Sequence, residues 1–344
     1  MKRVAGLDTI RFALAFIVLL GHGGLPHIDE SLIVPSRIFY YLDIIMKLFQ
    51  PVGVAAVMGF FVVSGFAIHL PYSQSITGLE RGKSLNILEF YSRRFVRIAI
   101  PATVAICIYH FTFGLFMGVI WSLICELIYY LLYPLILKYK KMYMKQILIG
   151  TFIASYMVTI LYSVTANGYS GDVHRQGFYL TWIVGLPVWL LGVVLADQYE
   201  DIKKAGKNIS FSRITVIRVA VWLAADFAAV LRFQGHIAYG YTLPVFAVFA
   251  YYWLKQEIAY YLNKKENRVL QFGGEMSYSL YLIHTLVLFA VGYYTNTEVH
   301  HSMNGWLCVL AIVLSLLASW IFYLLVEKPS HKLARSIKIR KNNL

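Results

Sequence analysis

Charged residues are scarce in this chain of 344 residues, because Asp, Glu, Lys and Arg together make up only 14% of it. Hydrophobic residues make up 59%, and the mean hydropathy is +0.63. A soluble domain needs a much more polar surface than this composition can provide. The composition therefore excludes a soluble enzyme and predicts a protein that crosses a membrane several times.

Features of two other classes are also missing. The chain has only three cysteines, and their spacing in apolar stretches indicates neither a disulfide framework nor a metal site. The N-terminus resembles a signal peptide, but Arg11 interrupts its apolar run and no small-residue cleavage site follows His22. We therefore expect no metal, and we expect the first apolar run to remain as a membrane span.

The chain does have a series of apolar runs, each close to the length of about 20 residues that a bilayer core requires. Ten runs are predicted as spans, at approximately residues 8–25, 52–71, 98–115, 118–137, 146–164, 178–196, 214–231, 238–256, 270–293 and 305–325. The predicted fold is all-α, a polytopic integral membrane helical bundle of about ten transmembrane helices. This membrane domain is predicted to fill residues 1–327, and a basic cytoplasmic tail to cover 328–344.

The net charge of +14 has an uneven distribution along the chain. If the N-terminus is cytoplasmic, 25 of the 31 lysines and arginines lie on the inner side of the membrane. The positive-inside rule then places both termini in the cytoplasm. Because this charge is spread over many inner loops, it is suited to anionic membrane lipids and predicts no nucleic-acid partner.

Arg11 and His22 both lie in the first predicted span, eleven residues apart. On a helix this spacing is a rise of about 16 Å and close to three full turns, so the two side chains share a face at different depths. An ionisable residue inside a span is costly and marks a candidate functional site. The alternative is that Arg11 extends to the inner interface and His22 caps the outer end.

A cluster of three arginines, Arg93, Arg94 and Arg97, comes just before the third predicted span. Spacings of three and four residues place these side chains on one helical flank. They either mark the cytoplasmic end of the span or form a site for a phosphorylated ligand, because guanidinium groups bind phosphates through paired hydrogen bonds.

Further polar residues lie within the second and fourth predicted spans. Ser122 and Glu126 are four residues apart on one helical face, with Trp121 near the outer interface. A carboxylate at the depth of Glu126 needs a partner or a proton. Ser64 belongs to a pattern of small residues that permits close helix packing.

The ninth predicted span aligns Ser277, Tyr281 and His284 on one stripe. His284, near mid-depth, is either a histidine with a satisfied hydrogen bond in the bundle interior or part of a polar cavity. Four other polar residues lie within spans and have no predicted role beyond packing or lining a cavity: His69, His110, Arg218 and Asp226.

Together these motifs resemble the acyltransferase-3 family of bacterial membrane O-acyltransferases, over nearly the whole chain. The resemblance rests on Arg11 and His22, and on four stretches in order: "GFFVVSGF", "RRFVRI", "WSLICE" and "SYSLYLIH". It departs from the family in two places. Almost no outer segment separates spans three and four, and Pro101 follows the arginine motif one residue later than is common.

The resemblance implies a multi-pass enzyme of the bacterial cytoplasmic (inner) membrane. Its donor would be an acyl-CoA, commonly acetyl-CoA, reached from the cytoplasm, and its acceptor a hydroxyl group of a lipid-linked or surface glycan. By the same resemblance Arg11 and His22 are the catalytic pair, Glu126 is the acidic site residue, and the arginine cluster receives the CoA phosphates. Trp121, Ser122, Ser64, Tyr281 and His284 would support the substrates.

The chemistry agrees with this implication, because transfer to an alcohol needs a base and a neutral imidazole is suited to that role near pH 7. An acyl-histidine intermediate is the alternative. Two rival functions are a glycan transporter and an assembly scaffold. In-span charges also mark transport paths, but no inverted repeat of the kind common in transporters is visible. A scaffold would not need Arg11, His22 and Glu126 inside the membrane.

Overall fold

In the computed structural model, the described residues are 4–23, 38, 41, 50–73, 85–114, 118–165, 172–173, 177–206, 208–295 and 305–337. Within these ranges the regular structure is helical and there is no β-strand. The helices are α1 (Leu7–Gly23), α4 (Gly53–His69), α5 (Ile87–Phe113), α6 (Ile120–Thr165), α7 (Gly177–Asp197), α8 (Tyr199–Ala205), α9 (Phe211–Phe233), α10 (Tyr239–Tyr261), α11 (Arg268–Glu275), α12 (Ser277–Thr295), α13 (Gly305–Phe322) and α14 (Lys328–Ser336).

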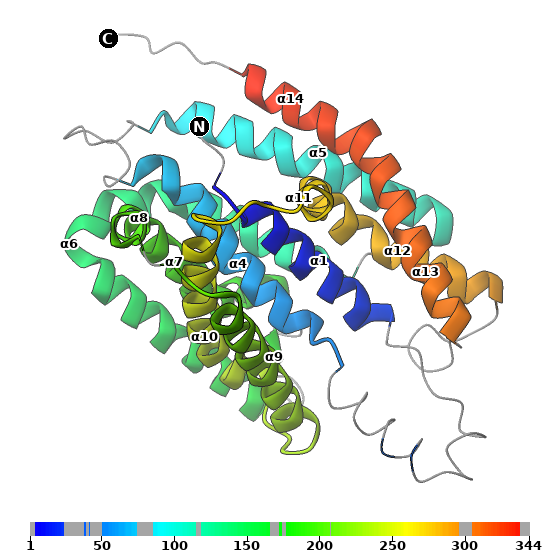
Figure 1. Ribbon diagram of the computed structural model, residues 1–344, viewed down its shortest axis with the longest axis horizontal. Helices are drawn as coiled ribbons and strands as arrows, with labels where there is room; N and C mark the ends of the chain where they lie inside the picture. The colour runs from blue at the N-terminus through cyan, green and yellow to red at the C-terminus, as the bar shows by residue number, and fades with distance from the viewer. Residues whose placement is uncertain are drawn as a thin grey trace.

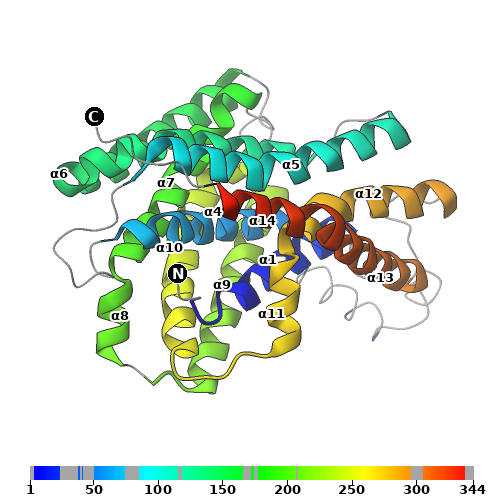
Figure 2. The same ribbon diagram turned by 90° about the horizontal axis from the view of Figure 1, so that it is seen from above.

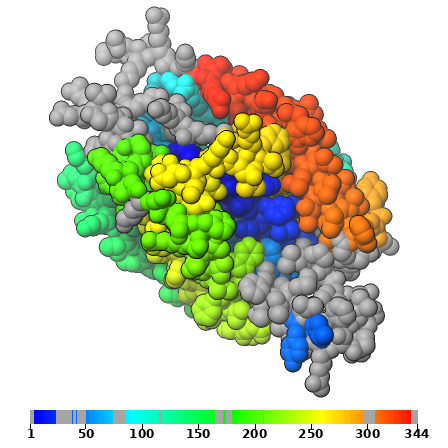
Figure 3. All heavy atoms as spheres, in the orientation of Figure 1, coloured from blue at the N-terminus to red at the C-terminus, as the bar shows by residue number. Residues whose placement is uncertain are grey.

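Helices α1 and α4 pass through the middle of the bundle (Figure 1). On one side α4 packs against α7 and α10, and on the other α1 packs against α11 and α12. Helices α5 and α14 lie side by side along one edge, as both ribbon views show (Figures 1 and 2). Part of α1 reaches the surface between α11 and α13, where it appears in dark blue in Figure 3. Helix α1 therefore contacts helices on both sides, although part of it remains at the surface.

The described residues contain seven helices that are long and apolar enough to cross a membrane. One of them, at 120–164, covers two of the predicted spans, and α1 and α10 occupy the positions of two more. Each of the ten predicted segments thus contains helix within its described residues, and the all-α membrane fold is confirmed. The number of ten separate spans stays a prediction.

The third predicted span starts earlier than expected. Helix α5 begins at Ile87, where the Asn86 side chain accepts a hydrogen bond from the Glu89 amide at 3.1 Å. Such an N-cap satisfies a backbone donor that the first helical turn leaves free. The arginine cluster therefore lies on α5 itself rather than before it, and Pro101 lies inside the helix rather than at its entry.

Two other predicted boundaries are also different. The fourth and fifth predicted spans form one helix, α6, which bends at Tyr143. The ninth predicted span is broken at Met276 into α11 and α12. Gly274 allows α11 to touch α1, because a β-carbon there would lie 2.0 Å from the Asp8 carbonyl oxygen. A continuous helix could not make this contact and also supply the start of α12 to the interior.

Helix α13 continues through a π-helical turn, Tyr323–Glu327, into α14. This stretch of 31 residues rises about 46 Å, which is more than the roughly 30 Å of a bilayer core. Its end must therefore project from the hydrocarbon region. The predicted tail thus begins as an ordered helix that packs on α5, and residues 338–344 lie outside the described part of the chain.

Candidate functional site

A cavity of about 770 Å³ opens among α1, α4, α5, α6, α12 and α14. It extends from the basic side chains of α14 to Ser122 and Tyr281 within the bundle. Its walls carry six of the polar residues that the sequence places inside spans: Arg11, Ser64, Ser122, Glu126, Ser277 and Tyr281. The inner ends of α1, α5 and α12 contribute to it, so the cavity belongs to the side where the charge distribution predicts the cytoplasm.

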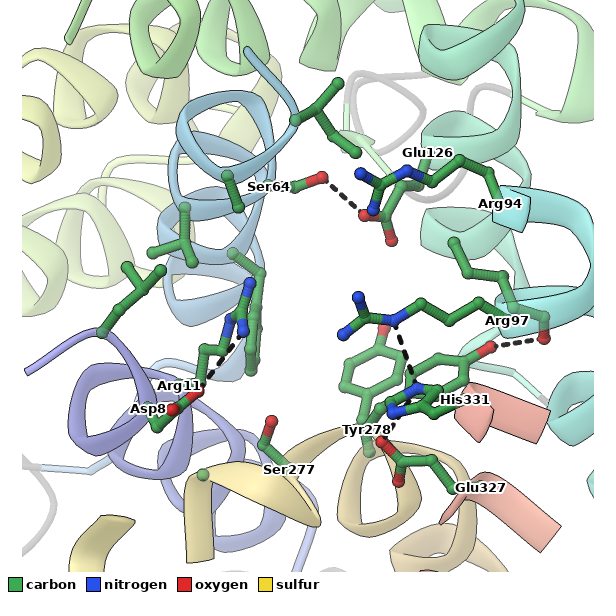
Figure 4. Close-up of a pocket in the computed structure, with 18 of the residues that line it drawn as sticks. Asp8, Arg11, Ser64, Arg94, Arg97, Glu126, Ser277, Tyr278, Glu327 and His331 are labelled. Atoms are coloured by element: carbon green, nitrogen blue, oxygen red, sulfur yellow. Dashed lines mark hydrogen bonds and ion pairs between the residues drawn. The ribbon is translucent and has the colours of Figure 1, made fainter. Parts of the chain in front are cut away.

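The first helix contributes Arg11 and Asp8, which face the cavity together (Figure 4). Arg11 Nη1 lies 3.4 Å from Asp8 Oδ1, one helical turn away. The Arg11 side chain is about one quarter exposed, so its charge is available to a molecule in the cavity. This location favours a role in the cavity over the alternative in which Arg11 only extends to lipid headgroups.

Two of the three clustered arginines, Arg94 and Arg97, line the cavity, and their guanidinium groups point into the same space as that of Arg11 (Figure 4). Arg97 Nε donates to His331 Nε2 at 3.2 Å. Arg93 is not part of the lining. Its Nη2 pairs with Glu89 Oε1 at 2.8 Å, and its Nε donates to the Ile337 carbonyl at 2.8 Å.

Glu126 lies in the cavity wall at the centre of a hydrogen-bonded group. Its Oε1 accepts from Ser64 Oγ at 2.5 Å and from the Tyr130 hydroxyl. Trp189 Nε1 in turn donates to Ser64 Oγ at 3.3 Å. Three helices, α4, α6 and α7, thus fix the Glu126 carboxylate, and its other oxygen faces the space that Arg94 also enters (Figure 4).

Ser122 and Tyr281 line the closed end of the cavity, which lies within the bundle and away from α14. The two hydroxyl oxygens are 2.5 Å apart, and Ser122 Oγ also donates to the Val119 carbonyl at 3.0 Å. Phe60 packs edge-on against the Tyr281 ring. Trp121 does not line the cavity but packs perpendicular to Phe61, with 6.3 Å between the ring centroids.

His22 and His284 form a pair next to this closed end. Their ring centroids are 5.1 Å apart, and that of His284 is 6.0 Å from Tyr281. His284 Nδ1 lies 2.9 Å from the Leu280 carbonyl, and His22 Nδ1 lies 2.9 Å from the Val18 carbonyl. A carbonyl oxygen only accepts hydrogen bonds, so both Nδ1 atoms carry a proton.

The protonated Nδ1 atoms determine the arrangement of the pair. His284 Nε2 lies 3.3 Å from His22 Nδ1, and in a neutral His284 its lone pair shares the single Nδ1 hydrogen of His22 with the Val18 carbonyl in a three-centre hydrogen bond. In a neutral His22 the lone pair is then on Nε2. His284 is fully buried, whereas His22 is part-buried and is not among the residues that line the cavity.

The sequence reasoning missed Glu327 and His331, which complete the cavity wall. Glu327 Oε2 accepts from both the amide and the hydroxyl of Ser279, at 3.0 and 2.5 Å. The π-helical turn that ends at Glu327 places its carboxylate at the break between α11 and α12. A π-helical turn is not visible in hydropathy, but an acidic residue so near the end of an apolar run was a usable signal.

The four polar residues without a predicted role are not among those that line this cavity. His69 forms hydrogen bonds through both ring nitrogens: Nδ1 lies 2.8 Å from the Tyr133 hydroxyl and Nε2 lies 2.9 Å from Asp197 Oδ1. Arg218 forms a paired ion bridge with Glu257, at 2.6 and 2.9 Å, and with Asp226 lines a second, mostly apolar cavity of about 350 Å³. His110 is exposed.

Comparison with known proteins gives one match. The family model described as "Acyltransferase domain", of the acyltransferase-3 family, matches residues 4–324, which include α1 to α13 and every candidate residue predicted from the sequence. No curated protein and no solved structure matches the chain. The chain therefore belongs to the acyltransferase-3 family and is a membrane acyltransferase.

Proposed function

We propose that this acyltransferase moves an acyl group, in the simplest case acetyl, from cytoplasmic acyl-CoA to a hydroxyl group of a lipid-linked or cell-surface glycan in the bacterial cytoplasmic membrane. The observation that carries the proposal is the cavity of about 770 Å³, with arginines near one end and the His22–His284 pair next to the other. This arrangement suits a long donor that has phosphates at one end and a reactive carbonyl at the other.

The donor end of the cavity has the charge that a phosphorylated molecule requires. Arg94 and Arg97 point into one space, and guanidinium groups make strong paired hydrogen bonds to phosphate oxygens. Arg11 shares this space and is about 16 Å along α1 from His22. Its position favours contact with an anionic part of the donor over stabilisation of charge at a carbonyl beside His22.

The transfer step uses the protonation state of His22. Its Nε2 takes the proton of the acceptor hydroxyl while the hydroxyl oxygen attacks the thioester carbonyl. The carbon–oxygen bond forms, the carbon–sulfur bond breaks, and the departing thiolate receives the proton from the imidazolium. His284 Nε2, by accepting from His22 Nδ1, keeps the His22 ring oriented and stabilises the imidazolium that forms.

His22 lies beyond the closed end of the cavity, so the acyl group has to move past the side chains at that end to reach it. Tyr281 and Ser122 stand at this point, and Tyr281 is in contact distance of the His284 ring. Each of these two hydroxyl groups could exchange its hydrogen bond to the other for one to a thioester or a sugar hydroxyl. Glu126, fixed by Ser64 and Tyr130, is placed to accept a hydrogen bond from a molecule in the cavity.

The test is mass spectrometry of surface glycans from cells with the wild-type gene, without the gene, and with His22→Ala at matched membrane levels. We expect an acyl mass increment on the glycan only with the wild type, and its position identifies the acceptor. Unmodified glycan in all three strains, together with polymer that accumulates inside cells without the gene, would instead support a transporter.

A further inference from the structure

Helix α14 presents a stripe of basic side chains to the cavity. Lys328, His331, Lys332 and Arg335 are spaced by three, one and three residues, so they share one face of the helix. All four line the cavity. None of them lies in the part of the chain that the family model matches, which ends at residue 324.

The other side of α14 is fixed to α5. Ser330 and Ala334 are buried there, and Ser330 Oγ donates to the Val96 carbonyl at 2.6 Å. Arg93 Nε donates to the Ile337 carbonyl, just after the last turn of α14. Arg93 is therefore a positioning residue for α14, and the basic stripe has a fixed direction with respect to Arg94 and Arg97.

Three of the four residues of the stripe have no carboxylate partner among the described residues, whereas His331 Nε2 lies 3.6 Å from Glu327 Oε1. Lys328, Lys332 and Arg335 are exposed, and none forms an ion pair with a carboxylate among the described residues. By contrast Arg11, on the α1 wall of the cavity, pairs with Asp8. These three cations around one opening, together with Arg94, form a site for an anion that enters from the predicted cytoplasmic side.

The cavity thus has two basic groups that lie side by side but differ in exposure, because Arg94 and Arg97 of α5 are part-buried whereas Lys332 and Arg335 of α14 are exposed. Acyl-CoA has two anionic groups in a fixed order, because the pyrophosphate lies between the pantetheine arm and the 3′-phosphate of the ribose. If the thioester extends toward Tyr281, the pyrophosphate lies deeper than the 3′-phosphate. The two basic groups follow the same order from the more buried pair on α5 to the exposed pair on α14.

We propose that Lys332 and Arg335 of α14 bind the 3′-phosphate of acyl-CoA, while Arg94 and Arg97 of α5 face its pyrophosphate. This inference rests on the proposed function, since it takes acyl-CoA as the donor. Helix α14 is then the part of the chain that distinguishes acyl-CoA from donors that lack the ribose phosphate.

The test compares the dissociation constants of acetyl-CoA and its 3′-dephospho form on purified full-length protein in phosphatidylcholine nanodiscs. The variant is Lys332→Gln/Arg335→Gln, and the matched control is Lys264→Gln/Lys265→Gln, which removes two exposed charges on the same predicted side. We expect the wild type and the control to prefer acetyl-CoA by about tenfold or more, since charge-assisted bonds are worth that much. The α14 variant should bind both donors alike.

Further variants and conditions separate the other outcomes. Lys332→Arg keeps the charge and should keep the preference, and an unchanged melting temperature shows that the variants are folded. An α14 variant that retains the full preference, or a wild type that binds both donors equally, overturns the role of α14 but leaves acyl-CoA as donor. A wild type that binds neither donor overturns the proposed function and this inference with it.

The headgroups of anionic lipids are a second candidate source of phosphate for a basic stripe. Repeating the measurement in nanodiscs that contain phosphatidylglycerol distinguishes the two sources. If the α14 variant differs from the wild type only in its response to phosphatidylglycerol, and not in the choice between the two donors, the stripe binds lipid and the inference is wrong.

Discussion

His284 has its main effect through a neighbouring side chain. Its Nε2 accepts from His22 Nδ1 at 3.3 Å, and its own Nδ1 is held by the Leu280 carbonyl. This geometry determines which His22 nitrogen carries the lone pair. The sequence indicated both histidines as candidates because in-span ionisable residues are costly, but it could not reveal that they are in contact, since 262 residues separate them.

Replacement of His284 tests this positioning role. We expect His284→Leu to lower kcat by about 10- to 100-fold, less than the loss of about 10²–10⁴ expected for a missing base, with little change in KM for the donor. His284→Gln should restore part of the rate, because an amide oxygen can also accept from His22. Thr285→Val, one residue further on α12, is the control. Equal effects of the Leu and Gln variants on kcat would contradict the positioning role.

Helix α4 owes its place beside α7 to two glycines. A β-carbon at Gly65 would lie 2.0 Å from the Trp189 carbonyl oxygen, and one at Gly192 would lie 2.0 Å from the Val62 carbonyl oxygen. Backbone atoms meet directly at this crossing, as small residues allow within membranes. The crossing also brings Trp189 within hydrogen-bond distance of Ser64, which supports the Glu126 group.

Enlargement of either glycine should separate the two helices. We expect Gly65→Ala to lower the free energy of unfolding by about 1–3 kcal/mol or more, because the neighbouring backbone cannot give way. Gly150→Ala is the matched control on α6, where no atom lies within 4 Å of the new carbon, and it should be neutral or slightly stabilising. Thermal unfolding in detergent measures both, and a similar melting temperature for the two variants would contradict the close crossing.

The sequence predicted which segments are helical better than where the helices begin and end. Apolar periodicity and length identified every segment, but the break at Met276 depends on the contact between Gly274 and α1, which only the folded chain contains. The basic stripe of α14 was readable from its spacing of three and four residues. It was interpreted as a tail because hydropathy falls sharply after Glu327.

For the whole molecule, the distribution of charge predicts that both termini lie in the cytoplasm. The cavity agrees with that orientation, since its opening is surrounded by the ends of α5 and α14. We therefore expect a C-terminal green fluorescent protein fusion to be fluorescent and a C-terminal alkaline phosphatase fusion to be inactive in intact bacteria. The opposite pair of results would reverse the orientation and place the donor site on the outer side.

The candidate site as a whole could be predicted only in part. The sequence identified Arg11, Arg94, Arg97, Ser122 and Glu126, which the structure brings to one cavity. It also grouped Arg11 with His22 as one face of a helix, whereas in the structure one lines the cavity and the other contacts His284. Helical spacing gives direction but not depth in the bundle, and depth is decided by the helices that surround α1.

The role of His22 can be measured as the rate at which free CoA thiol appears when purified protein is given acetyl-CoA and acceptor-bearing membranes. We expect acceptor-dependent thiol release with the wild type. We expect His22→Ala to lower that rate by about 10²–10⁴-fold, the usual contribution of a general base, with acetyl-CoA binding preserved because the basic groups of the cavity are intact. A His22→Ala protein that releases thiol at the wild-type rate would show that another group performs the transfer.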